Sequence, residues 1–258
     1  PRRRLYVPLM RSEHVYPVLK AALWAGLAAG LLLGLFHLVL TEPVIDRAIA
    51  LEGEAAKPPG QAARYEPAVS REVQKVGLVA GSTIYGLLVG LLFAAVLVLV
   101  GRRLPGPRPH VKAAVLAGLL WWSAALLRSL KYPANPPGVG DPETAVFRQA
   151  FQVSFIVLSV LAVAVAAAFY WLLGRRWPRW HEGERRLGLA VALYGVLAVL
   201  LLVAFPPNPD PVTAPADLVW DFRILAISGQ ALFWAVLGGV SALLVRRSAQ
   251  RDTLEGVG

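Results

Sequence analysis

Six apolar stretches, most of them long enough to cross a membrane, constrain this chain more than any other feature. A spanning helix needs about 20 mostly apolar residues, because the hydrocarbon core is roughly 30 Å thick and each helical residue rises about 1.5 Å. Hydrophobic residues make up 57% of the 258 and charged residues only 16%, against about 25% charged in soluble domains. The sequence therefore predicts one integral membrane domain over residues 1–258, all-α, and excludes a large soluble catalytic domain. The predicted spans are about 21–40, 77–100, 113–127, 151–174, 187–205 and 224–245.

The third stretch is the shortest, with fifteen residues between Lys112 and Arg128. Either its ends reach out to the headgroups, or Arg128 lies inside the membrane zone. A charge at that depth needs water or a partner. We expect Arg128 at or just inside the outer headgroup boundary, where it contacts an outer carboxylate or loop carbonyls. Simple snorkelling to the headgroups is the alternative.

Basic residues alternate between the loops in the way that the positive-inside rule describes. Of the 26 Lys and Arg, 17 fall on one side of the six spans, together with both termini, whereas 11 of the 16 Asp and Glu fall on the other side. We therefore expect both termini to be cytoplasmic. The charge is explained by topology and by attraction to lipid headgroups of the bilayer, so we expect no nucleic-acid partner.

The chain repeats itself with a period near 73 residues, which predicts three parallel helical hairpins. Each hairpin starts inside, emerges into an outer loop and returns. The first is divergent, with a long outer loop over residues 41–76. The matching segments are Gly101–Pro105 with Gly174–Pro178, Tyr132–Pro136 with Phe205–Pro209, and Phe147-Arg148 with Phe222-Arg223.

Small residues mark one face of the first span and two faces of the second. Such spacing lets helix backbones approach closely in a membrane, so we expect tight packing there. A pore or oligomer face is the alternative. The glycines are Gly26, Gly30 and Gly34 in the first span, with the pairs Gly77/Gly81 and Gly86/Gly90 in the second.

Polar residues gather just beyond the first span. We expect Thr41 to cap a second helix that starts with Pro43 in its first turn and lies across the outer mouth as an interfacial helix. His37, Glu42 and Asp46 would then offer one imidazole and two carboxylates, a set suited to cobalt, nickel or zinc. The alternative is an interfacial histidine beside a solvated acidic helix face, with no ligand.

The two repeated outer loops are rich in proline, and extended proline segments are stiff. Their acidic residues could attract cations to an entrance, or could be solvated caps of turns. No nucleophile, dinucleotide or phosphate-binding motif accompanies them, so we expect no enzyme activity and no cofactor. The loop charges are Asp141, Glu143, Asp210, Asp217 and Asp221 beside Arg148 and Arg223.

Three segments carry a resemblance to a known family. The chain is similar to the CbtA family of probable cobalt transporter subunits in Phe36–Ala48, Tyr132–Thr144 and Phe205–Pro209. The resemblance covers nearly the whole chain. It implies a small multi-pass protein of the bacterial cytoplasmic membrane, linked to cobalamin metabolism, with a companion single-span subunit that carries a histidine-containing tail.

The resemblance implies a membrane subunit of a divalent cobalt (cobalt/nickel) uptake transporter, with Co²⁺ or Ni²⁺ as cargo. The companion would supply the missing ligands for the metal. The alternative is an accessory or structural subunit packed against a larger membrane complex with no transport of its own, since the second, fourth and fifth spans hold few polar residues that could line a path.

Overall fold

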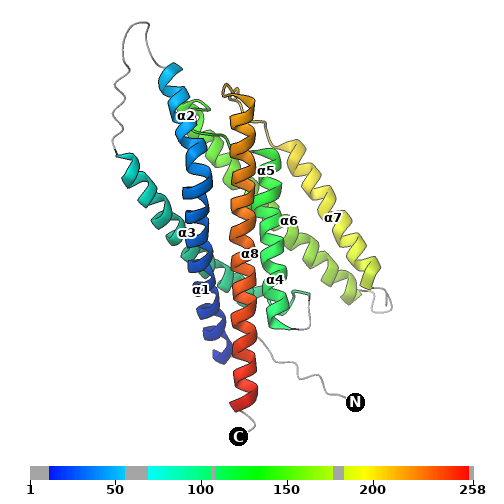
Figure 1. Cartoon of the computed structure of the whole chain (residues 1–258). Helices are drawn as coiled ribbons and strands as arrows, with labels where there is room; N and C mark the ends of the chain where they lie inside the picture. Colours follow the sequence, from blue (N-terminus) through cyan, green and yellow to red (C-terminus); the bar gives the residue numbers. More distant parts are fainter. Residues whose placement is uncertain (1–11, 56–68, 106–107, 177–182, 256–258) are drawn as a thin grey trace. The chain divides into compact units, whose positions relative to one another are not determined.

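The computed structural model describes residues 12–55, 69–105, 108–176 and 183–255, and this part of the chain is helical with no strand (Figure 1). The α-helices are joined by two π-helical segments, η1 and η2, and one 3-10 turn, η3. In chain order the elements are α1 (Ser12–Phe36), η1 (His37–Thr41), α2 (Glu42–Ala55), α3 (Arg71–Val100), α4 (Pro109–Leu120), η2 (Trp121–Leu126), α5 (Leu127–Lys131), η3 (Pro142–Thr144), α6 (Ala145–Arg176), α7 (Gly183–Ala204) and α8 (Ala216–Glu255).

Six helical runs among the described residues are long and apolar enough to cross a membrane, which confirms the all-α, six-span prediction. The third is 23 residues long, because α4, η2 and α5 follow one another without interruption. The length of the apolar stretch, fifteen residues, therefore underestimates the length of the helical run that contains it. The runs are Val15–Glu54, Arg71–Val100, Pro109–Lys131, Pro142–Arg176, Gly183–Ala204 and Ala216–Gln250.

The chain divides into two compact units, each with its own packing. Unit 1 comprises Pro1–Gly118 and Ser228–Gly258, and unit 2 comprises Leu119–Ile227. In unit 1, α1 packs along α3. In unit 2, α6 packs against α7 and against η2.

Glycines bring the backbones of α1 and α3 together in unit 1. A Cβ atom at Gly26 would collide with the carbonyl oxygen of Gly86, and one at Gly90 would lie 2.6 Å from the carbonyl oxygen of Ala22. Because a Cβ cannot fit there, the close approach requires glycine. The prediction is thus confirmed for the first span and for the pair Gly86/Gly90.

The pair Gly77/Gly81 behaves differently. A Cβ at either position would meet nothing within 4 Å, and both glycines are exposed. The predicted close packing at this pair is not found among the described residues: Gly34 of α1 approaches α3 at Val79 and Ser82, so α1 covers another face of this stretch of α3.

The core of unit 2 is built from aromatic rings. Phe155 on α6 is fully buried, and its ring meets the rings of Tyr132 and Phe205 edge to face at centroid distances of 5.8 and 5.2 Å. Edge-to-face pairs at such distances are favourable because the positive rim of one ring meets the negative face of the other. This cluster fixes the start of both proline-rich loops, since Tyr132 and Phe205 are their first residues.

Candidate functional site

A π-helical turn at the end of α1 holds the predicted metal residue His37. The chain runs from α1 through η1 into α2 without leaving the helical region, so the predicted cap at Thr41 and the break that would start a separate helix are wrong. Pro43 explains the π turn: a proline inside a helix removes one hydrogen bond and crowds the carbonyl four residues earlier. That carbonyl belongs to Val39, inside η1.

The imidazole of His37 is held on both of its nitrogen sides. Its Nδ1 is hydrogen-bonded to Oγ1 of Thr41 at 2.8 Å. Its Cε1–Nε2 edge lies against Gly229 of α8, where a Cβ atom would come within 2.9 Å of Cε1 and 3.0 Å of Nε2. Because Gly229 has no side chain, the imidazole ring fits beside it. Any larger residue at this position would displace the ring.

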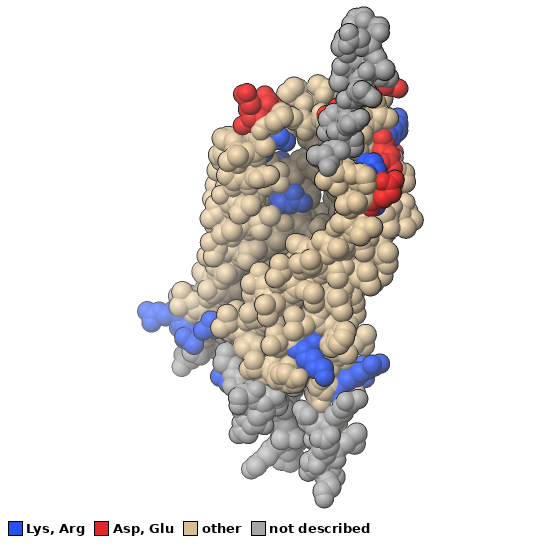
Figure 2. All heavy atoms as spheres, turned by 90° about the vertical axis from the view of Figure 1, so that its left-hand side faces the viewer, with Lys and Arg blue, Asp and Glu red and all other residues tan. Residues whose placement is uncertain are grey.

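Glu42 and Asp46 of α2 form a charged cluster with the first turn of α3. Arg71 Nη2 donates to Glu42 Oε2 and, at 2.6 Å, to Asp46 Oδ1, while Lys75 Nζ lies 3.3 Å from Asp46 Oδ2. Figure 2 shows acidic and basic side chains side by side at this edge of the molecule. The Glu42 side chain is only 7% exposed, so its carboxylate depends on Arg71 for compensation.

The predicted ligands therefore meet partners within the protein. His37 bonds to Thr41, and the two carboxylates bond to Arg71 and Lys75. In the described part of the chain, no group of three His, Asp or Glu side chains is arranged so that it could hold a metal ion. The metal assignment stays a prediction. The sequence did hold a signal for the observed pairing: acids at 42 and 46 and bases at 71 and 75 share the helical spacing of four with opposite sign.

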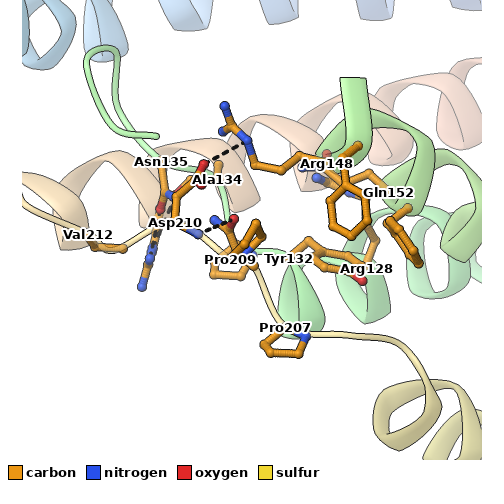
Figure 3. Close-up of a pocket in the computed structure, with 15 residues that line it drawn as sticks. Arg128, Tyr132, Ala134, Asn135, Arg148, Gln152, Pro207, Pro209, Asp210 and Val212 are labelled. Carbon is orange, nitrogen blue, oxygen red and sulfur yellow. Dashed lines mark hydrogen bonds and ion pairs between the residues drawn. The ribbon is translucent and has the colours of Figure 1, made fainter. Parts of the chain in front are cut away.

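Unit 2 holds a cavity of about 380 Å³, with both polar and apolar walls, between its two proline-rich loops and the helices that follow them (Figure 3). The predicted charge Arg128 is one of the residues in its wall. The lining residues are Arg128, Tyr132, Pro133, Ala134, Asn135, Phe147, Arg148, Phe151, Gln152, Pro207, Asn208, Pro209, Asp210, Val212 and Arg223.

The two matching arginines cross-link the two loops. Arg148, in the first turn of α6, pairs through Nε with Asp210 Oδ2 at 3.0 Å in the second loop. Arg223 of α8 donates through Nη2 to Asn135 Oδ1 at 2.9 Å in the first loop. Each arginine thus bonds to the proline-rich loop that matches the one preceding it in the chain. The matching sequences do not by themselves reveal these contacts between the two loops.

Arg128 lies half-buried at the end of the third span and donates through Nη2 to Ser129 Oγ at 3.4 Å. Its place in the cavity wall gives a polar surrounding to a charge that follows fifteen apolar residues. The predicted contact with an outer carboxylate or loop carbonyl stays a prediction.

A second π-helical segment, η2, lies just before these residues. Within it, the buried carbonyl of Ser123 accepts a hydrogen bond of 2.8 Å from the hydroxyl of Ser159 on α6. Inside a membrane such a carbonyl needs a partner from the protein. Ser159 therefore stabilises the irregular turn that leads to Arg128.

Helices of membrane-spanning length, glycine-packed backbones and apolar stretches with few charged side chains define a multi-pass helical membrane protein. The chain belongs to the family described as probable cobalt transporter subunit (CbtA), whose model matches residues 16–246. The predicted resemblance is confirmed, and the chain is accordingly a membrane subunit of the cobalt-transport type. Neither the curated proteins nor the solved structures contain a match.

Proposed function

We propose that this chain forms the membrane-embedded part of an uptake transporter for Co²⁺ or Ni²⁺ and works with a single-span partner that carries a histidine-containing tail. The family match carries the proposal. A transporter subunit needs partners, and a His-bearing tail would add the nitrogen ligands that cobalt and nickel favour. Three parallel hairpins with both termini in the cytoplasm would place the proline-rich loops outside.

We assign His37, Glu42 and Asp46 to the first binding of the cation. In this structure Arg71 and Lys75 form ion pairs with the carboxylates of Glu42 and Asp46. A divalent cation would have to replace these side chains, and the imidazole would have to leave Thr41 or use Nε2. Supporting this assignment, the three residues lie on one continuous helical run beside Gly229, whose missing side chain gives the imidazole room.

Uptake of radioactive cobalt into cells tests the assignment. His37→Ala and Asp46→Asn should each lower uptake at least tenfold, whereas Glu54→Gln should leave it unchanged because Glu54 is an exposed acid on the same helix. Gly229→Ala should act like a weaker form of His37→Ala, since it displaces the ring without removing it. Normal uptake by His37→Ala at normal expression would reject the metal assignment.

Reporter fusions test the topology. A reporter after Arg247 should be cytoplasmic, and one inserted near Gly138 should be external. The same location for both would show that the third span does not cross the membrane.

An accessory role without transport is the second candidate. The observation that favours it is the lack of a ready three-ligand set in the described residues. Uptake measured with and without the His-bearing partner separates the two. Transport that needs both chains supports the first proposal, and transport by another complex that this chain only stabilises supports the second.

A further inference from the structure

The ionisable groups that line the cavity of unit 2 carry an excess of positive charge. Three arginines, Arg128, Arg148 and Arg223, face one carboxylate, Asp210. We propose that this cavity binds an oxyanion, the carboxylate or phosphate group of a small ligand or of a lipid headgroup. This proposal concerns unit 2 alone and does not depend on the transport of cobalt.

Arg223 is the residue best placed to bind such a group. Its Nε donates to the carbonyl of Ala134 at 3.2 Å and its Nη2 to Asn135 Oδ1 at 2.9 Å. Both acceptors are neutral, so they orient the guanidinium without cancelling its charge. A guanidinium has five N–H donors in a rigid plane that matches carboxylate and phosphate, and Nη1 donates to no acceptor in the described part of the chain.

The single carboxylate of the cavity is already used by the protein. Asp210 Oδ2 accepts hydrogen bonds from Arg148 Nε at 3.0 Å, from the Thr144 hydroxyl at 2.8 Å and from the Asp141 backbone N–H at 3.1 Å. The Asp210 side chain is 7% exposed. A bare divalent cation would find no open carboxylate here and would be repelled by the arginines, so the cavity selects for the opposite charge.

The walls of the cavity are fixed before any ligand arrives. The Tyr132 hydroxyl donates to the carbonyl of Pro206 at 2.8 Å, and the Asp210 N–H donates to Asn208 Oδ1 at 3.3 Å. The rings of Phe147 and Phe151 pack at a tilt of 52° with their centroids 4.4 Å apart, and they give the cavity an apolar side. Positioned donors beside an apolar wall are typical of small-molecule sites, whose volumes start at about 300 Å³.

Citrate and inorganic phosphate are the probes for the test, with the full chain in nanodiscs of phosphatidylcholine. Isothermal titration should show citrate bound to the wild type and to Arg176→Gln, a control that removes an exposed arginine outside the cavity. Arg223→Gln should bind citrate about tenfold or more weakly, since hydrogen bonds to charged groups are among the stronger ones. Cobalt chloride should bind Arg223→Gln as it binds the wild type.

Changing the lipid of the nanodiscs shows whether the oxyanion comes from a lipid headgroup or from a soluble ligand. If a headgroup is the natural occupant, phosphatidylglycerol in the nanodiscs should block citrate and should be retained by the wild type but not by Arg223→Gln in native mass spectrometry. If a soluble ligand is the occupant, citrate should bind equally in both lipids.

Equal binding of citrate, phosphate and phosphatidylglycerol to wild type and Arg223→Gln would overturn the proposal, as would no binding of any of them to the wild type. Should Arg223→Gln fail to fold, Arg128→Gln takes its place, because it lowers the charge of the same cavity. Unchanged citrate binding in that variant would overturn the proposal as well.

Discussion

In unit 1 the helices α1 and α3 meet through glycine backbones, whereas the helices of unit 2 pack around the rings of Tyr132, Phe155 and Phe205. Both units face the same difficulty, since lipid tails are as apolar as leucine and give little drive for helices to associate. Unit 1 gains close contact along two helices and leaves no space between them. Unit 2 fills the space between its helices with large side chains, and its cavity lies beside this aromatic cluster, since Tyr132 and Phe151 also line the cavity.

The polar residues differ in the same way. In unit 1 two acids of α2 bond to two bases of α3, so opposite charges cancel at the helix ends. In unit 2 arginines outnumber the carboxylate around the cavity. The charges of α2 and α3 in unit 1 thus neutralise one another, while the cavity of unit 2 keeps an excess of positive charge that a ligand can balance.

Gly86→Leu is expected to have the largest effect. A Cβ there would collide with the carbonyl of Gly26 and lie 2.6 Å from the Cα of Gly30, so the backbones of α1 and α3 must separate. We expect little or no folded protein in size-exclusion chromatography. Gly81→Leu on the same helix is the control, and it should fold normally because nothing lies within 4 Å of its Cβ position. Equal recovery of the two variants would mean that the glycines do not hold unit 1 together.

Phe155→Ala is the matching change in unit 2 and should be severe but not complete. Truncating a buried phenylalanine costs about 3–5 kcal/mol through lost contacts and the cavity left behind. Unfolding by sodium dodecyl sulfate should show this loss. Val157→Ala two residues along is the control, because Val157 is 51% exposed on the same helix. If Phe155→Ala is no worse than Val157→Ala, the aromatic cluster is not the core of unit 2.

Arg71→Ala should cost less, about 1–2 kcal/mol, because it leaves the buried carboxylate of Glu42 without its partner. Lys75→Ala removes the more exposed pair and should cost no more than about 1 kcal/mol. The same detergent unfolding measures both. A larger effect of Lys75→Ala would show that Asp46, and not Glu42, is the carboxylate that needs compensation.

The six spans, the family and the packing face of α1 could be predicted from the sequence, because hydrophobic length and glycine spacing are local properties. At Gly77/Gly81 the same spacing meets no described residue within 4 Å, since sequence spacing does not say which face of a helix a partner covers. The π turn at His37 also escaped prediction. It results from the competition between Pro43 and the hydrogen bonds of the helix before it.

The candidate sites were harder to predict because their partners lie far apart in the chain. Glu42 and Arg71 are separated by 29 residues, and Arg223 and Asn135 by 88. His37, Glu42 and Asp46 looked like a ligand set because the bases that pair with the two carboxylates, Arg71 and Lys75, lie 29 residues further along the chain. The loop charges Arg148 and Asp210 looked like solvated turn residues, although their pairing buries the carboxylate.

Tyr132→Phe should have the smallest effect and sharpens the comparison at the edge of the cavity. The ring stays in the aromatic cluster, and only the hydrogen bond of 2.8 Å to the carbonyl of Pro206 is lost. Burial raises the pKa of the Tyr132 phenol, so the hydroxyl is a neutral donor at physiological pH. Losing one neutral hydrogen bond costs about 0.5–1.5 kcal/mol. Tyr16→Phe is the control, since Tyr16 is 69% exposed, and it should leave unfolding unchanged. If Tyr132→Phe destabilises as much as Phe155→Ala, the hydroxyl and not the edge-to-face ring cluster is what joins the two proline-rich loops, and the contrast between the two units would have to be redrawn.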